Sequence, residues 1–204
     1  MYECRTAARR WVEFTIEDMD RPAVRSFVEV VEYNPEWPDH FDELRDRIWP
    51  AVRDVAAAIE HVGSTAVAGM AAKPVIDLDI VIPSRAELAV VITRLAGLGY
   101  EHRGNLEIED REAFQTLRNQ PPHNLYVCPR ESIALRNHLA LRDHLRGHPE
   151  DVLAYSNLKK ELAVLFSHDI DRYVEGKTEF ILAILAQQGF STDRLEAIRR
   201  ANRA

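Results

Sequence analysis

The chain has 204 residues, and its 26 basic and 33 acidic side chains give a formal charge of −7. This acidic balance argues against an extended nucleic-acid surface, although a local basic pocket is compatible with it. An apolar content of 46% is enough for one globular domain with a substantial core.

Targeting signals are weak in this sequence. No apolar run approaches the roughly 20 residues that a membrane span needs. The N-terminal residues lack the apolar core of a secretory signal, and the 2 cysteines do not suggest a disulfide framework. We therefore expect a cytoplasmic protein.

The first part of the chain predicts β-rich segments followed by a helix. Residues 11–17 and 27–33 are rich in β-forming side chains. Asn34 and Pro35 predict the helix start, as N-cap and first helical residue. Pro50 is expected to interrupt the helix, with residues 51–59 continuing as a second helical piece. The buried stripe of the first piece should consist of Trp37, Phe41, Leu44 and Ile48.

The middle of the chain predicts most of a sheet. A short strand is expected at 59–62, followed by a Gly-Ser turn and a strand that ends at Ile82. A helix should cover about 85–98. Two further strands are expected, at 106–109 and 123–128.

From Glu131 onward the pattern is helical. Pro149 should break the first helix, and the last helix should cover about 171–188, with Gly189 as its C-terminal stop. Strands followed by helices predict an α+β fold, in which helices flank a mixed sheet and a helical part follows it.

The segment IDLDIVI, at residues 76–82, contains the clearest chemical signal. In a strand, alternate side chains point to opposite faces, so Asp77 and Asp79 share one face, about 7 Å apart. Two carboxylates this close on an apolar strand repel each other unless a cation lies between them. Carboxylate oxygens suit a hard ion, and Mg²⁺ is the ion that we expect. A lone Asp-x-Asp would be a weak signal, because surface strands often carry alternating acids.

The turn Gly63-Ser64 precedes this strand. A small-residue turn that leads into a helix offers free backbone N–H groups to a phosphate. Lys73, just before the strand, either contacts a phosphate or lies on the surface. His61 either orients a substrate or is packed, and His123 either contacts nucleotide or metal or is a strand-end histidine.

Basic side chains in the helical part are spaced to share helix faces. A triphosphate needs several cations besides its metal, and helices packed over a sheet can supply them. The alternative is ordinary amphipathicity, with tyrosines at the core margin and cations reaching water. The candidate pairs are Arg142 with Arg146, Tyr155 with Lys159, and Tyr173 with Lys177.

Four ordered blocks resemble the GrpB-like family of the nucleotidyltransferase-fold superfamily. They read VEYNPEWPDHF, HVGSTAVAGMAAKPVIDLDI, LRDHLRGHPEDVLAYSNLKKEL and RYVEGKTEFI, and the match extends from about residue 28 to 189. We therefore expect an N-terminal extension at 1–27, the family domain at 28–190 and a C-terminal tail at 191–204.

The resemblance implies a Mg²⁺-dependent protein that transfers a nucleotidyl group from a nucleoside triphosphate to an unidentified acceptor. Gly63 and Ser64 would hold phosphate, and Asp77 and Asp79 would bind the metal. The superfamily usually adds a third carboxylate from a neighbouring strand, yet residues 123–127 contain none. Either Glu107 or Glu109 substitutes, or both are solvent-facing.

Two other functions are compatible with the missing carboxylate. One is a non-catalytic nucleotide- or cofactor-binding module linked to coenzyme A metabolism, since members of the family occur fused to dephospho-CoA kinase. The other is a protein-interaction domain that retains only the fold and binds no nucleotide.

Overall fold

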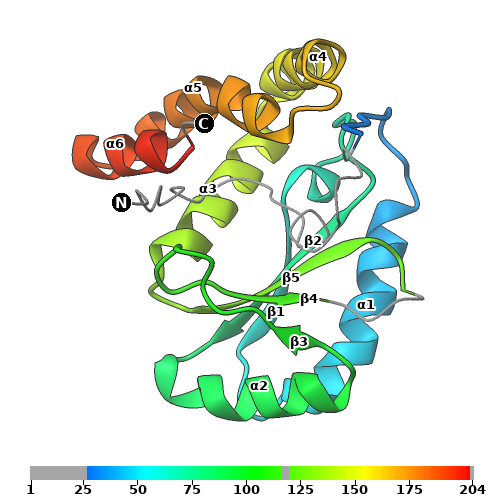
Figure 1. Cartoon of the computed structure of the whole chain (residues 1–204), viewed down its shortest axis with the longest axis vertical. Helices are drawn as coiled ribbons and strands as arrows, with labels where there is room; N and C mark the ends of the chain where they lie inside the picture. Colours follow the sequence, from blue (N-terminus) through cyan, green and yellow to red (C-terminus); the bar gives the residue numbers. More distant parts are fainter. Residues whose placement is uncertain (1–26, 116–119, 203–204) are drawn as a thin grey trace, which may run out of the picture.

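A computed structural model describes residues 27–115 and 120–202. Its centre is a five-stranded sheet in the order β1-β2-β5-β4-β3 (Figure 1). The segment 11–17 lies outside the described residues. The strands are β1 (Ala58–Val62), β2 (Ile76–Ile82), β3 (Glu101–His102), β4 (Glu112–Gln115) and β5 (His123–Pro129).

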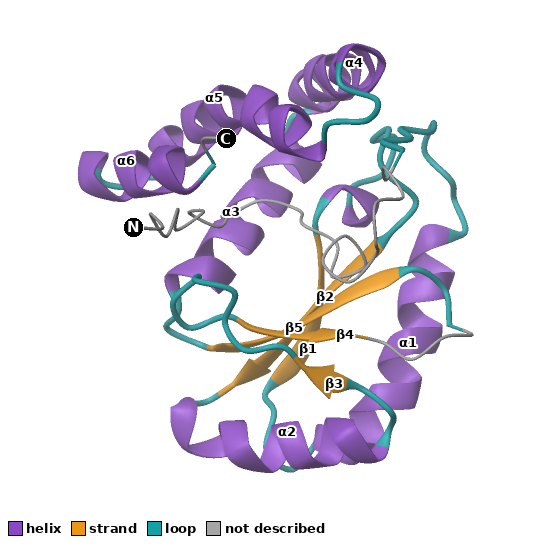
Figure 2. Ribbon diagram, viewed as in Figure 1, coloured by secondary structure: helices purple, strands orange, loops and turns teal. Residues whose placement is uncertain are grey.

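The sheet is mixed, because β2 runs parallel to β5 while the other neighbouring pairs are antiparallel. Helices α1 (Trp37–Val52) and α2 (Leu88–Gly97) pack on one face. Helix α3 (Ile133–Gly147) contacts β1 and β5 and also contacts the helical layer beyond (Figure 2). The predicted α+β fold with a C-terminal helical part is confirmed.

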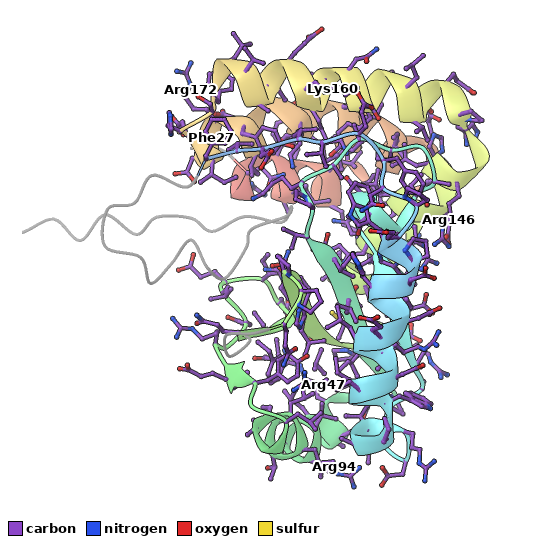
Figure 3. All side chains as sticks on the ribbon, turned by 90° about the vertical axis from the view of Figure 1, so that its right-hand side faces the viewer. Phe27, Arg47, Arg94, Arg146, Lys160 and Arg172 are labelled. Carbon is purple, nitrogen blue, oxygen red and sulfur yellow. The ribbon has the colours of Figure 1, made fainter. Side chains whose placement is uncertain are left out.

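The helical layer consists of α4 (Pro149–Leu165), α5 (Ile170–Gln187) and α6 (Thr192–Ala201). In Figure 3 it forms one end of the molecule, and α2, marked by Arg94, forms the other. Gly189 follows α5 with φ of 78°, as expected for a helix stop. Part of the segment that we set apart as a tail forms α6, whose buried Ile198 packs into the cluster with α5.

For helix α1, the sequence predicts the buried face correctly but not where the helix begins and ends. Its predicted stripe is buried, from Trp37 to Ile48. The helix begins at Trp37, because the Asn34 side chain accepts a hydrogen bond from the Glu36 N–H and forms a turn just before it. It continues through Pro50 to Val52. The prediction of a second helical piece at 51–59 is wrong, because Pro50 lies in the last turn of α1 and the chain then leads into β1.

Two β-strand predictions also need correction. Residues 106–109 form a turn, not a strand, because Leu106 and Glu107 have φ of 48° and 63°, which no extended strand allows. The strand lies later, at β4. Residues 27–33 contribute only the single bridge between Val31 and Ala72.

The faces of β2 explain its alternating sequence. Ile76, Leu78 and Ile80 belong to the core formed with α1 and α2. The intervening Asp77 and Asp79 therefore face α3 and the helical layer. The sheet thus separates an apolar core from the face that carries the acids.

Within the part of the chain that the structure describes, we find no helix long and apolar enough to cross a membrane.

Candidate functional site

Both aspartates of β2 are buried. Asp77 is 8% exposed, and Asp79 is fully buried. The parallel register pairs Asp77 with Asn124 and Asp79 with Tyr126, so these β5 residues lie on the same face of the sheet. The acids therefore lie beside an amide and a phenol, rather than beside a third acid.

Each aspartate has a specific partner. The Asn124 amide donates a hydrogen bond of 2.6 Å to Asp77 Oδ1. His138, on α3, lies with Nδ1 at 2.7 Å from Asp79 Oδ2, and an unprotonated carboxylate makes that nitrogen the donor. Asp79 Oδ1 is buried without a hydrogen-bond partner among the described residues. That oxygen needs a donor or a cation.

The Gly63-Ser64 turn packs directly against this pair. Gly63 has φ of 69° and ψ of −169°, a conformation open essentially to glycine alone. A Cβ built on it would lie 2.2 Å from Asp77 Oδ2. Ser64 then starts the short 3-10 helix η2 (Ser64–Ala66). Only a glycine allows the main chain to approach the carboxylate this closely.

A lysine from the helical layer reaches the same turn. Lys159 Nζ donates to Ser64 Oγ at 2.7 Å and lies 4.6 Å from the centre of the Tyr155 ring. Lys177 repeats the arrangement over Tyr173, at 4.4 Å. The two lysines are 1% and 0% exposed. Both tyrosine–lysine pairs are thus buried in the helical layer, and the Lys159 ammonium contacts the Gly63-Ser64 turn.

The two predicted arginines hold the backbone around the turn. Arg142 donates to Glu60 Oε2 at 2.7 Å and to the His61 carbonyl at 3.0 Å. Arg146 donates twice to the Ala66 carbonyl, at 3.0 and 2.9 Å. These bonds attach α3 to both sides of the Gly63-Ser64 turn. Both guanidinium groups are thus engaged with the chain around the turn, and their contact with a polyphosphate stays a prediction.

The two histidines of the prediction lie on the opposite face of the sheet. His123 contacts the Tyr100 hydroxyl at 3.0 Å and the Pro121 carbonyl at 2.7 Å, so it does not reach Asp77. His61 stacks on Phe41, with ring centres 4.5 Å apart. Burial lowers the pKa of both histidines, that of His61 to about 4, where nearby arginines add to the effect.

Among the residues that the structure describes, no third carboxylate joins the pair. Glu107 and Glu109 are exposed in the turn before β4, which agrees with the alternative that both face solvent. In the described ranges, no group of three or more histidine, cysteine or acidic side chains is arranged to hold a metal. The orphaned Asp79 oxygen and the two carboxylates still fit one hard cation, since such ions favour oxygen ligands.

Two pockets share Asp77 as a wall. A small one lies between the turn and the start of β2, and the half-buried Lys73 lines it. Its lining residues are Ser64, Thr65, Ala72, Lys73, Val75, Asp77 and Asn124. A larger one lies toward α3 and α5. Asp77 therefore lies between a small pocket with mainly polar side chains and a larger pocket with an apolar wall.

Local sequence patterns do not predict several residues of this site. His138 lies on a helix 59 positions from Asp79, and no motif surrounds it. The sequence predicts Asn124 as the second residue of a strand, but only the register of β2 and β5 places it next to Asp77. Arg111 is buried at 2% exposure beside Tyr126, although a charged residue in a polar loop normally predicts a surface position.

The mixed sheet, the Asp-x-Asp strand and the glycine turn against it define a protein of the nucleotidyltransferase fold. The solved structure of the GLD-2/RNP-8 complex matches with a TM-score of 0.50 and 16% identity, over 71% of this chain and 59% of that one. At that identity the similarity concerns the fold alone. The model of the family described as "GrpB protein" matches residues 27–187, and the chain belongs to this family.

Relatives within the family are similar over most of this chain. UPF0157 protein YqkA of Bacillus subtilis (strain 168) is 35% identical over 154 residues, which cover 76% of this chain and 45% of YqkA. The crystal structure of conserved protein GrpB from Enterococcus faecalis matches with a TM-score of 0.71 and 28% identity, over 78% of this chain and 96% of that one. The chain thus spans less than half the length of YqkA.

A further similarity is to a kinase. Dephospho-CoA kinase of Mycolicibacterium paratuberculosis (strain ATCC BAA-968 / K-10) is 35% identical over 197 residues, which cover 82% of this chain and 47% of the kinase.

Proposed function

We propose that the protein binds a nucleoside triphosphate with Mg²⁺ and transfers its nucleotidyl group to a small acceptor. The observation that carries this proposal is the contact between Lys159 and Ser64. It places a buried cation on the glycine turn that packs against Asp77. A phosphate chain bound there would lie between the cation and the acidic pair.

Asp77 and Asp79 would hold the Mg²⁺ ion. The ion would supply positive charge at the phosphate oxygens during transfer. His138 orients the Asp79 carboxylate through its 2.7 Å contact, as outer partners of metal ligands commonly do. With two carboxylates and one amide on the face, the chain supplies ligands for one ion more readily than for two.

The lysines would neutralise the phosphates. Lys159 is already on the turn, Lys73 lines the neighbouring pocket, and Lys177 is buried in the helical layer. Tyr155 and Tyr173 fix the two buried ammonium groups over their rings, an arrangement that strengthens when water is excluded. Transfer itself would be an attack of the acceptor on the α-phosphorus with departure of pyrophosphate. The chain would contribute by positioning and charge.

Calorimetry with Mg²⁺ and each nucleoside triphosphate tests the proposal. The variants Asp77→Asn and Asp79→Asn should each lose metal-dependent nucleotide binding. Asp39→Asn, which changes an exposed acid at the start of α1, should bind as the wild type does. Equal binding by Asp77→Asn and wild type would refute the assignment of the site.

A second function has its own support. Asn124 occupies the position opposite Asp77, where a third carboxylate would complete a catalytic set. The similarity to a dephospho-CoA kinase suggests a non-catalytic nucleotide- or cofactor-binding module linked to coenzyme A metabolism. Metal-dependent turnover with a panel of nucleotides and acceptors, lost in Asp79→Asn, excludes this function. Binding without turnover across the panel favours it.

A further inference from the structure

The larger pocket beside Asp77 also contains a buried arginine, Arg111. Arg111 is 2% exposed, and its Nε has no hydrogen-bond partner among the described residues. In the part of the chain that the structure describes, its guanidinium takes part in no ion pair. Its Cζ atom lies over the Tyr126 ring, at 4.3 Å from the ring centre. A buried guanidinium nitrogen without a hydrogen-bond partner is costly, because its lost hydration is not replaced.

A second unpartnered atom lines the same pocket. The Oδ1 atom of Asn137, on α3, is buried without a hydrogen-bond partner among the described residues. Asn137 is 7% exposed. The pocket thus contains an unused strong donor on Arg111 and an unused acceptor on Asn137. A ligand that satisfies both has an anionic group and a hydrogen-bond donor.

The remaining wall is apolar. Leu141 of α3 and Ile181 and Leu185 of α5 line the pocket. The apolar wall suits a short hydrocarbon body between the polar ends of a ligand.

We propose that this pocket binds a small organic anion, a carboxylate or a phosphate monoester, that also has a hydroxyl or amino group. Arg111 receives the anion, since its planar fork matches the oxygens of both groups. The Asn137 oxygen accepts from the hydroxyl or amino group. Because Asp77 lines the same pocket, this ligand would be the acceptor of the transfer, an identification that rests on the proposed function. The binding of the anion in this pocket does not depend on the proposed function.

Thermal shift measurements on the full chain test the pocket. The carboxylate arm uses γ-hydroxybutyrate and ε-hydroxycaproate, and the phosphate arm uses glycerol phosphate. Butanediol has no anion, and butyrate has no donor. We expect the melting temperature to rise with at least one hydroxylated anion, less with butyrate and not with butanediol. The proposal is overturned if neither arm raises it.

Arg111→Met is the decisive variant, because it keeps the length of the side chain without its charge. It should lose the anion-dependent shift while its melting temperature without ligand is unchanged or higher. Arg172→Met is the matched control, since Arg172 also lies over an aromatic ring, Phe166, at 4.4 Å. Arg172 is exposed at the outer end of the helical layer (Figure 3). A full shift retained in Arg111→Met contradicts the proposal.

Two further variants complete the design. If Arg111→Met does not fold, Arg111→Lys tests the anion contact instead, because it keeps the positive charge but not the planar guanidinium group. A reduced shift supports the contact, and an undiminished one contradicts it. Lys159→Met separates this inference from the proposed function. It removes a phosphate contact without lining this pocket, so the anion shift should persist whether or not nucleotide binding is found.

Discussion

Lys159 and Ser64 are 95 positions apart in the chain, and their side chains are joined by a hydrogen bond of 2.7 Å. The bond connects helix α4 to the turn that packs against Asp77. It therefore couples the helical layer to the face of the sheet that carries the acids. Both partners are buried, so the bond is shielded from water and strengthened by its charge.

Lys159→Met should weaken binding of Mg²⁺–nucleotide by about tenfold or more, because a buried cation next to the phosphate turn is lost. Lys160→Met is the matched control, since the side chain of Lys160 is 38% exposed and pairs with Glu32 at the surface. Calorimetric titration of both variants checks the prediction. Equal loss of affinity in the two would show that the effect is not specific to the turn.

Gly63→Ala should destabilise the protein by about 3 kcal/mol, because the new Cβ meets the Asp77 carboxylate and the backbone adopts a glycine conformation. Gly69→Ala is the control for backbone strain alone, since Gly69 has φ of 78° and nothing within 4 Å of its Cβ position. It should cost about 1 kcal/mol. Urea unfolding measures both changes. Similar losses in the two variants would contradict the close contact with Asp77.

His61 should make the protein less stable in acid. Its pKa is lowered from 6.5 to about 4 in the folded state, so protonation favours the unfolded chain. Its contribution is fully present above pH 6.5 and is lost as the pH falls toward 4, up to about 3 kcal/mol. His61→Gln should reduce this dependence, as measured by urea unfolding at several pH values. An unchanged difference between neutral and acidic stability in the variant would count against the buried neutral histidine.

Asn124→Asp should destabilise the metal-free protein by about 2 kcal/mol, because a carboxylate replaces the amide that donates to Asp77 and like charges then repel. Mg²⁺ should restore much of the loss, since the substitution adds an oxygen ligand to the pair. Melting temperatures with Mg²⁺ and with a chelator check both parts. A variant that is equally unstable in both conditions would show that the face does not bind the ion.

The sequence alone determined the features that depend on neighbours in the chain. The alternation of residues 76–82 places Asp77 and Asp79 together, because side chains alternate in any strand. The helical spacing from Trp37 to Ile48 predicts the buried face of α1 for the same kind of reason. Four ordered blocks identified the family and hence the fold.

Tertiary structure decided which side chains meet. The register of β2 with β5 puts Asn124 opposite Asp77 and turns His123 to the other face. The packing of α3 brings His138 to Asp79 and commits Arg142 to the backbone of the turn. These contacts join residues from distant parts of the chain. Which of these residues meet depends on how the helices and strands pack, and the local periodicity of the sequence does not contain that information.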